Sequence, residues 1–127
     1  MATASGKSVS SRVSGNHVET QVAGRVVGST IREMIADYER LGGGPVWLIR
    51  AEGATAYTTE AVNEAVGGFG RLFKERNLRR IIAVIVKPTV RMGASIVAMS
   101  LRAAGSPVDI HVVGDAAAAT TALEARV

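Results

Sequence analysis

Two adjacent threonines, Thr58 and Thr59, stand at the start of a helix-length segment without proline, residues 58–77. A hydroxyl at the N-terminus of a helix can accept a hydrogen bond from a free backbone N–H group, and such a cap is worth about 1 kcal/mol. The same hydroxyl can instead carry a phosphate or help to bind an anion, because the positive end of the helix dipole lies there. Glu60 already places a negative charge in the predicted first turn. We favour the cap and keep a phosphorylation or anion site at the two threonines as the alternative.

Basic residues gather in one stretch of the sequence, positions 71–91, where the only acidic residue is Glu75. Such a cluster could bind phosphate, an acidic protein or an anionic membrane surface. The alternative is a solvated helix end, because Lys and Arg interact favourably with the dipole at a helix C-terminus. The candidate patch for an anionic partner consists of Arg71, Lys74, Arg76, Arg79, Arg80, Lys87 and Arg91.

Nothing in the sequence supports a catalytic or metal centre. The chain has no cysteine, which removes disulfides, thiolate catalysis and thiolate metal sites. Its two histidines, His17 and His111, are far apart in the sequence, and only Asp109 stands at ligand spacing from one of them. No nucleophile has a base beside it, and no two carboxylates are paired at a predicted cleft. We therefore predict a protein that is not an enzyme and that needs no metal or cofactor.

The elements that position these residues are organised around the apolar run Ile81 to Val86, which lies between Arg80 and Lys87. An uninterrupted apolar run of this length is typical of a strand that is covered on both faces. We interpret it as the central strand of an α/β sheet that carries helices on both sides.

Alternating apolar residues before position 27 predict an opening hairpin, and helices and strands then alternate to the end of the chain. Ser29 is the expected cap of the first helix and Asp115 that of the last. The result is an α/β fold with a mixed sheet of about five strands and about four helices. We expect a disordered tail over residues 1–8 and a single domain over residues 9–127. The expected helices span 30–41, 58–77, 91–104 and 116–126, and the expected strands after the hairpin span 46–50, 81–86 and 108–113, with a loop at 51–57.

The third predicted helix, residues 91–104, carries only one charge after Arg91, namely Arg102. A small domain can rarely bury a helix on all sides, so part of this apolar surface is a candidate contact for a second subunit or another partner. The alternative is that the helix is covered by its own domain. The candidate contact residues are Met92, Ile96, Val97, Met99 and Leu101.

This order of elements resembles the STAS-like fold of bacterial anti-sigma-factor antagonists. The likeness is greater to the divergent branch described as sporulation-antagonist-like or lipid-transfer-like STAS domains. It extends over about residues 17–126 and rests on strand ends and small residues. The segments that carry it are Gly24-Arg25-Val26, Trp47-Leu48-Ile49-Arg50, the stretch from Gly53 to Ala61, Arg79 to Ile85, and Arg91-Met92.

In the antagonist family a serine at the start of the second helix is phosphorylated by a partner kinase, usually within an Asp-Ser-x-Gly stretch. The unmodified form binds the kinase. The matching stretch of this sequence is Tyr57-Thr58-Thr59-Glu60-Ala61, which lacks the aspartate and the glycine. The resemblance thus implies the fold and a signalling role through a protein partner, whereas the departure speaks against the usual phosphorylation switch.

Composition and resemblance together predict a bacterial protein of the cytoplasm. No apolar run approaches the roughly 20 residues of a membrane span. The leading hypothesis is a non-enzymatic regulatory or scaffolding module that acts through protein–protein contacts, with a homodimer as one form. The alternative is a binder of a small anionic or lipid-like ligand between the sheet and the helices. Nucleic-acid binding, suggested only by the sequence pI of about 10.1, is the least favoured of the binding hypotheses.

Overall fold

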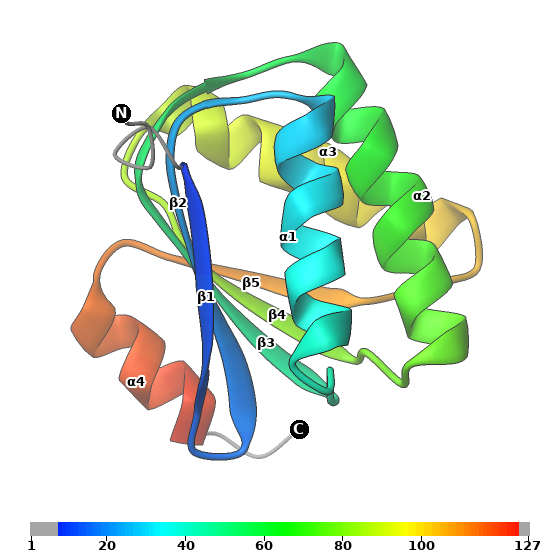
Figure 1. Cartoon of the computed structure of the whole chain (residues 1–127). Helices are drawn as coiled ribbons and strands as arrows, with labels where there is room; N and C mark the ends of the chain where they lie inside the picture. Colours follow the sequence, from blue (N-terminus) through cyan, green and yellow to red (C-terminus); the bar gives the residue numbers. More distant parts are fainter. Residues whose placement is uncertain (1–7, 125–127) are drawn as a thin grey trace, which may run out of the picture.

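Strands and helices follow one another in the predicted order, β-β-α-β-α-β-α-β-α (Figure 1). The structure is a computed structural model that describes residues 8–124; the predicted disordered tail lies outside this range apart from Ser8. The strands are β1 (Val9–Ser14), β2 (His17–Val26), β3 (Val46–Tyr57), β4 (Arg80–Val84) and β5 (Asp109–Val113). The helices are α1 (Gly28–Arg40), α2 (Thr59–Glu75), α3 (Pro88–Ala103) and α4 (Ala116–Glu124). The predicted α/β fold class is confirmed.

The five strands form one mixed sheet in the order β1-β2-β3-β4-β5. Only the opening hairpin of β1 and β2 is antiparallel, and every later pair is parallel. The middle strand is therefore β3, and the apolar strand β4, which we predicted at the centre, lies beside it. Its predicted burial on both faces is confirmed, because every residue from Ile81 to Ile85 is at most 5% exposed. Val86, the last residue of the apolar run, is 58% exposed.

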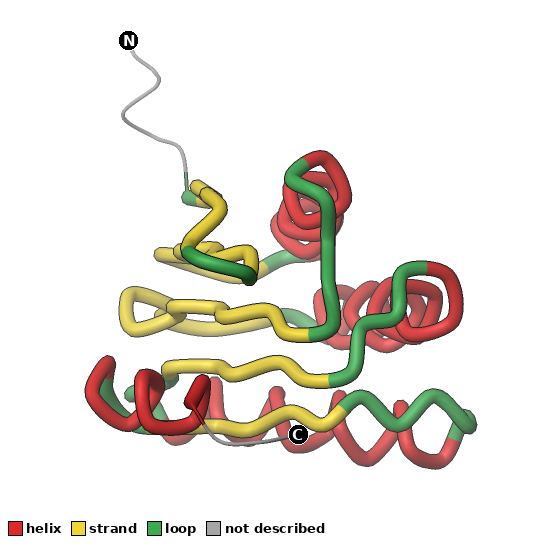
Figure 2. Tube along the Cα trace, turned by 90° about the horizontal axis from the view of Figure 1, so that it is seen from below, coloured by secondary structure: helices red, strands yellow, loops and turns green. Residues whose placement is uncertain are grey.

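Helices cover the sheet on both faces, with α1, α2 and α3 on one side and α4 on the other (Figure 2). The larger core centres on Trp47, whose ring stacks on Tyr38 at a centroid distance of 4.5 Å and meets Phe69 edge-on at 5.6 Å. Its indole Nε1–H donates to the buried hydroxyl of Thr20 at 2.9 Å. This bond satisfies the one polar group that burial of the ring would otherwise leave unpaired.

Strand β3 continues to Tyr57, so the predicted loop at residues 51–57 is wrong. This half of the strand pairs with the end of β2, and the pairing contains two register shifts. The last pair is Val26 with Tyr57. Its small residues fit a close approach of the two strands, because a Cβ at Gly53 would lie 3.2 Å from the Cβ of Ala23. Alanine and glycine are poor strand formers on average, and for this reason the sequence pattern did not indicate a strand here.

Two helices begin earlier than predicted. The first starts at Gly28, and the hydroxyl of Thr30, not that of Ser29, accepts a hydrogen bond at its end, from the N–H of Val27 at 3.1 Å. The third starts at Pro88, since a proline at the first helical position loses no hydrogen bond. The predicted cap at Asp115 is confirmed, because its Oδ1 accepts the N–H of Ala118 at 2.7 Å.

Candidate functional site

The candidate site lies where the parallel strands end and the helices that follow them begin, an edge of the sheet that we call the carboxyl edge. Three short connections cross this edge: Val27 leads into α1, Thr58 into α2, and residues 85–87 into α3. Because the strands are parallel, the N-termini of α1, α2 and α3 lie at the same edge. Ligands of open parallel sheets bind at this edge as a general rule.

The structure distinguishes the two threonines, Thr58 and Thr59, for which the sequence left the role of helix cap and that of modification site open. The hydroxyl of Thr58 caps α2 by accepting the N–H of Ala61 at 3.1 Å, and its own backbone N–H donates to the carbonyl of Val26 at 3.1 Å. Thr58 is half-buried, whereas Thr59 is exposed in the first turn of the helix. Thr58 is therefore the cap, and Thr59 is the hydroxyl that a modifying enzyme could reach.

Glu60 lies between the starts of two helices. It belongs to the first turn of α2, and its side chain reaches the start of α1 so closely that a Cβ at Gly28 would lie 2.6 Å from its Cδ and Oε1 atoms. The first turn of α1 contains no acidic residue of its own. The Glu60 carboxylate therefore supplies negative charge near the positive ends of both helix dipoles.

Several residues of the predicted basic patch are paired with carboxylates. Arg71 binds both carboxylate oxygens of Glu39 at 3.0 Å, and the Nε–H of Arg76 donates to the same group at 3.1 Å. The hydrogen bond from Arg71 holds the pKa of the Glu39 carboxyl below its ordinary value. Arg80 donates to Asp109 at 3.0 Å. This part of the patch is largely neutralised within the chain.

The predicted basic residues do not form one patch. Arg79 lies over the ring of Phe73, with its Cζ 4.4 Å from the centroid, near the end of α2 and the start of β4. Lys87 and Arg91 lie at the other end of β4, at the carboxyl edge. Arg91 donates from Nε to the carbonyl of Ile85 at 3.4 Å. The cluster that is continuous in sequence is thus split between the two ends of a strand.

The predicted contact residues of the third helix lie on two different faces of α3. Val97 and Leu101 belong to the core, with exposed fractions of 6% and 0%, so their prediction as contact residues is wrong. Met92 and Met99 are each 61% exposed, and Ile96 is 37% exposed. These three residues follow one another at helical spacing and form one line on the outer side of α3, which we call the α3 stripe.

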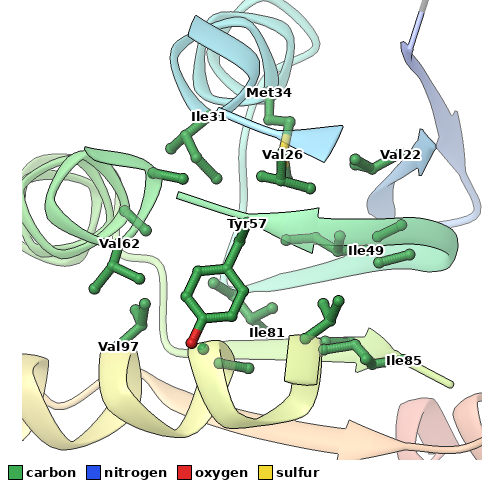
Figure 3. Close-up of a pocket in the computed structure, with 18 of the residues that line it drawn as sticks. Val22, Val26, Ile31, Met34, Ile49, Tyr57, Val62, Ile81, Ile85 and Val97 are labelled. Atoms are coloured by element: carbon green, nitrogen blue, oxygen red, sulfur yellow. The ribbon is translucent and has the colours of Figure 1, made fainter. Parts of the chain in front are cut away.

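A cavity of about 120 Å³ lies between the sheet and the three helices that cover its larger core. Figure 3 shows side chains from α1, α2, α3 and the strands pointing into it. Seven of its twenty lining residues are alanine or glycine, which is why the side chains do not fill the space. This space, with its apolar lining, is a candidate site for an apolar ligand.

Tyr57 stands at the boundary of this cavity. It is the last residue of β3 and is half-buried, and its ring reaches toward α3 (Figure 3). The ring lies against Gly93, where a Cβ would come within 2.8 Å of the ring carbon Cε1. Neither Tyr57 nor Gly93 was predicted from the sequence as part of a pocket. For Gly93 the one signal in the sequence was its place among the small residues of the third predicted helix, and the sequence pattern gave no signal for Tyr57.

Among residues 8–124, no three His, Asp or Glu side chains come together as a metal site would require. In the same range no helix is both long enough and apolar enough to cross a membrane.

The arrangement of one opening hairpin, alternating parallel strands and helices, and a final helix on the opposite face is that of the STAS-like fold, which is also called SpoIIAA-like. Comparison of the sequence with protein-family models gives no match, and comparison with curated proteins gives none either. The fold is therefore recognised from its geometry.

Two solved structures show the likeness. One is a protein of the DUF3478 family from Shewanella loihica PV-4, described as having a SpoIIAA-like fold, with a TM-score of 0.61 and 13% sequence identity over 91% of each chain. The other is the anti-sigma factor antagonist SpoIIAA in its unphosphorylated form, with a TM-score of 0.59 and 13% identity over 91% of this chain and 96% of that one. At this identity the likeness shows the fold alone, and the STAS-like fold predicted from the sequence is confirmed.

Proposed function

We propose that the chain is a non-enzymatic regulatory or scaffolding module of the bacterial cytoplasm that binds another protein through the α3 stripe. The observation that carries the proposal is the exposure of Met92, Ile96 and Met99 on a helix whose opposite face is fixed in the core. A second copy of the chain, giving a homodimer, is the partner that we test first.

The α3 stripe has the chemistry of a helical contact surface. Its residues stand at positions i, i+4 and i+7, the spacing at which an apolar helix face docks on a partner. Two of the three are methionines, whose flexible side chains adapt to surfaces of different shape. The core residues Val97 and Leu101 hold the helix in place, so the stripe is presented on a rigid element.

The structural likeness supports this proposal. SpoIIAA is described as an antagonist of an anti-sigma factor, a name that denotes action on another protein. If the present chain uses the same fold in the same manner, its partner surface should lie on elements near the start of α2. Met92, at the beginning of the α3 stripe, meets this condition, because α2 and α3 pack against each other and both begin at the carboxyl edge.

The test replaces Met92 and Met99 together with Glu and measures the mass of the protein by light scattering over a range of concentrations. Val97 is unsuitable for this purpose, because its burial means that a charge there would unfold the chain. A matched control adds two Glu at exposed positions elsewhere, Ser10→Glu with Ala117→Glu.

We expect wild type and control to form the same dimer and the α3 variant to be monomeric. If wild type is monomeric, the same three proteins are compared as baits for proteins of the native host. A partner that is retained by wild type and control and lost by the α3 variant would support the proposal. Equal behaviour of all three proteins in both assays would refute it.

A further inference from the structure

We propose that the cavity between the sheet and helices α1, α2 and α3 is a binding site for a small, uncharged, hydrocarbon-like molecule of about the size of benzene, which enters beside Tyr57. This inference is independent of the α3 stripe, because the lining belongs to the inner faces of the helices.

The chemistry of the lining determines the class of ligand. Nineteen of the twenty lining residues have side chains without a nitrogen or oxygen atom, and the hydroxyl of Tyr57 is the only polar group among them. No charged side chain lines the space, so nothing would compensate a buried carboxylate or phosphate. An apolar ligand therefore fits the cavity, whereas the anionic ligand that the sequence offered as an alternative does not fit inside it.

The volume determines the size of the ligand. Apolar cavities of about 150 Å³ lined by Leu, Ile and Phe stay dry and bind benzene or xenon. The present cavity of about 120 Å³ is slightly smaller and has a lining of the same kind. It is well below the roughly 300–1,000 Å³ of pockets for drug-sized ligands. A single ring or a short alkyl segment therefore matches it, and a complete lipid does not.

We place the entrance beside Tyr57, because several lining residues are only half-buried there. Val26, Tyr57, Val62 and Ala94 are half-buried, and they come from the end of β2, the end of β3, the start of α2 and the start of α3. Figure 3 shows the ring of Tyr57 extending between Val62 and the sheet toward α3.

The ring of Tyr57 is held by packing. Its neighbour Gly93 contributes no side chain, and within the described chain no hydrogen bond to another residue fixes its hydroxyl. Packing against α3 therefore keeps the ring at the boundary of the cavity.

The first experiment adds benzene to the wild-type protein, with its Ile, Val and Leu methyl groups labelled, and follows their NMR signals. We expect saturable shifts at lining residues, such as Ile49, Ile81 and Val97, and none at Val113, which lies in the core on the opposite face of the sheet. The absence of saturable shifts, or equal shifts at Val113, would overturn the proposal.

A pair of Ala→Leu variants tests the position of the ligand. Ala65→Leu places three more carbon atoms in the cavity, whereas Ala117→Leu makes the same change on the exposed side of α4. We expect benzene affinity to fall by at least about tenfold in the first variant and to stay within about twofold in the second. If Ala65→Leu does not fold, Ala94→Val at the rim of the cavity takes its place with the same expectation. Unchanged affinity in a folded cavity variant would contradict the proposed site.

A third experiment tests whether the cavity prefers an uncharged ligand. It compares two probes of the same chain length, 1-hexanol and hexanoate. The uncharged alcohol should bind at the lining residues and the carboxylate should bind more weakly, because no cationic side chain lines the cavity. Binding of hexanoate as tight as that of hexanol would refute the assignment to an uncharged ligand.

Discussion

The ring of Tyr57 occupies the space above the backbone of Gly93 that a side chain would otherwise fill, with ring carbons 2.8 to 3.0 Å from the position of a Cβ. The two residues are far apart in sequence and belong to β3 and α3. Their contact closes one side of the apolar cavity, so the glycine in the middle of a helix has a packing reason.

Gly93→Ala should destabilise the protein, although glycine-to-alanine changes inside helices usually stabilise by about 1 kcal/mol. The new methyl group would collide with the ring of Tyr57, and overpacking of this kind costs about 1–3 kcal/mol. We expect the free energy of unfolding in urea to fall by about 1 kcal/mol after the two effects are combined. Gly67→Ala on α2 is the matched control, because no atom lies within 4 Å of its new methyl group, and it should raise stability. A gain at both positions would show that the ring is not held in this position.

Val84→Asp should prevent folding. Val84 is 0% exposed in the smaller core under α4, and an unpaired carboxylate there would cost several kcal/mol out of a total stability of about 5–15 kcal/mol. Val86→Asp is the control two residues further along, where the side chain is 58% exposed and the change should cost no more than about 0.5 kcal/mol. Circular dichroism and thermal melting distinguish the two. A Val84→Asp protein that melts cooperatively near the wild-type temperature would contradict the burial of this strand.

Glu39 should make the free energy of unfolding depend on pH in the acidic range. Its hydrogen bonds to Arg71 and Arg76 lower the pKa of its carboxyl from the ordinary value of 4.5, with the bond to Arg71 as the largest cause. A group with a lowered folded-state pKa stabilises the protein above its unfolded pKa, and this contribution is lost as the pH falls through the folded pKa. Glu39→Gln should therefore reduce stability near neutral pH and have less effect at acidic pH.

The measurement is the free energy of unfolding in urea at about pH 7 and about pH 3 for wild type, Glu39→Gln and Glu124→Gln. The difference between the two pH values should be smaller in Glu39→Gln than in wild type. Glu124, exposed at the end of α4, serves as the control and should leave the difference unchanged. The same pH dependence in all three proteins would mean that the Glu39 pair adds nothing to stability.

The order of the elements could be predicted from the sequence because each interior strand or helix has a distinct apolar pattern. Which side of α3 faces the core could not be predicted from the sequence, because the helix has two apolar faces. Met92, Ile96 and Met99 form one of them, and Val97 and Leu101 form the other. Periodicity alone does not decide which of two apolar faces meets the sheet.

The cavity could not be predicted from the sequence either. Its boundary depends on the contact of Tyr57 with Gly93, two residues that only the folded chain brings together. In the basic cluster the fold has the opposite effect: residues that are close in sequence, such as Arg80 and Lys87, are separated by the length of β4.

Thr58→Ala should lower the free energy of unfolding by about 1 kcal/mol, because it removes the hydroxyl that accepts the N–H of Ala61. Thr58→Asp should be nearly neutral, since aspartate also caps well. The neighbouring change Thr59→Ala is the control and should leave stability nearly unchanged, because Thr59 is exposed and is not the cap. Urea unfolding measures all three. Equal losses for the two alanine variants would show that the helix is capped in another way.

Thr59 is the position at which a phosphorylation switch can be tested without removing the cap. If its hydroxyl only faces solvent, wild type, Thr59→Ala and Thr59→Asp should bind a partner identified through the α3 stripe with equal affinity. If it is a switch, the added charge should weaken binding in Thr59→Asp and leave Thr59→Ala unaffected. We expect equal affinities, because Glu60 already supplies negative charge at this helix start and would repel a phosphate on the adjacent residue. Loss of binding confined to Thr59→Asp, measured by calorimetry, would overturn this expectation and favour regulation by phosphorylation.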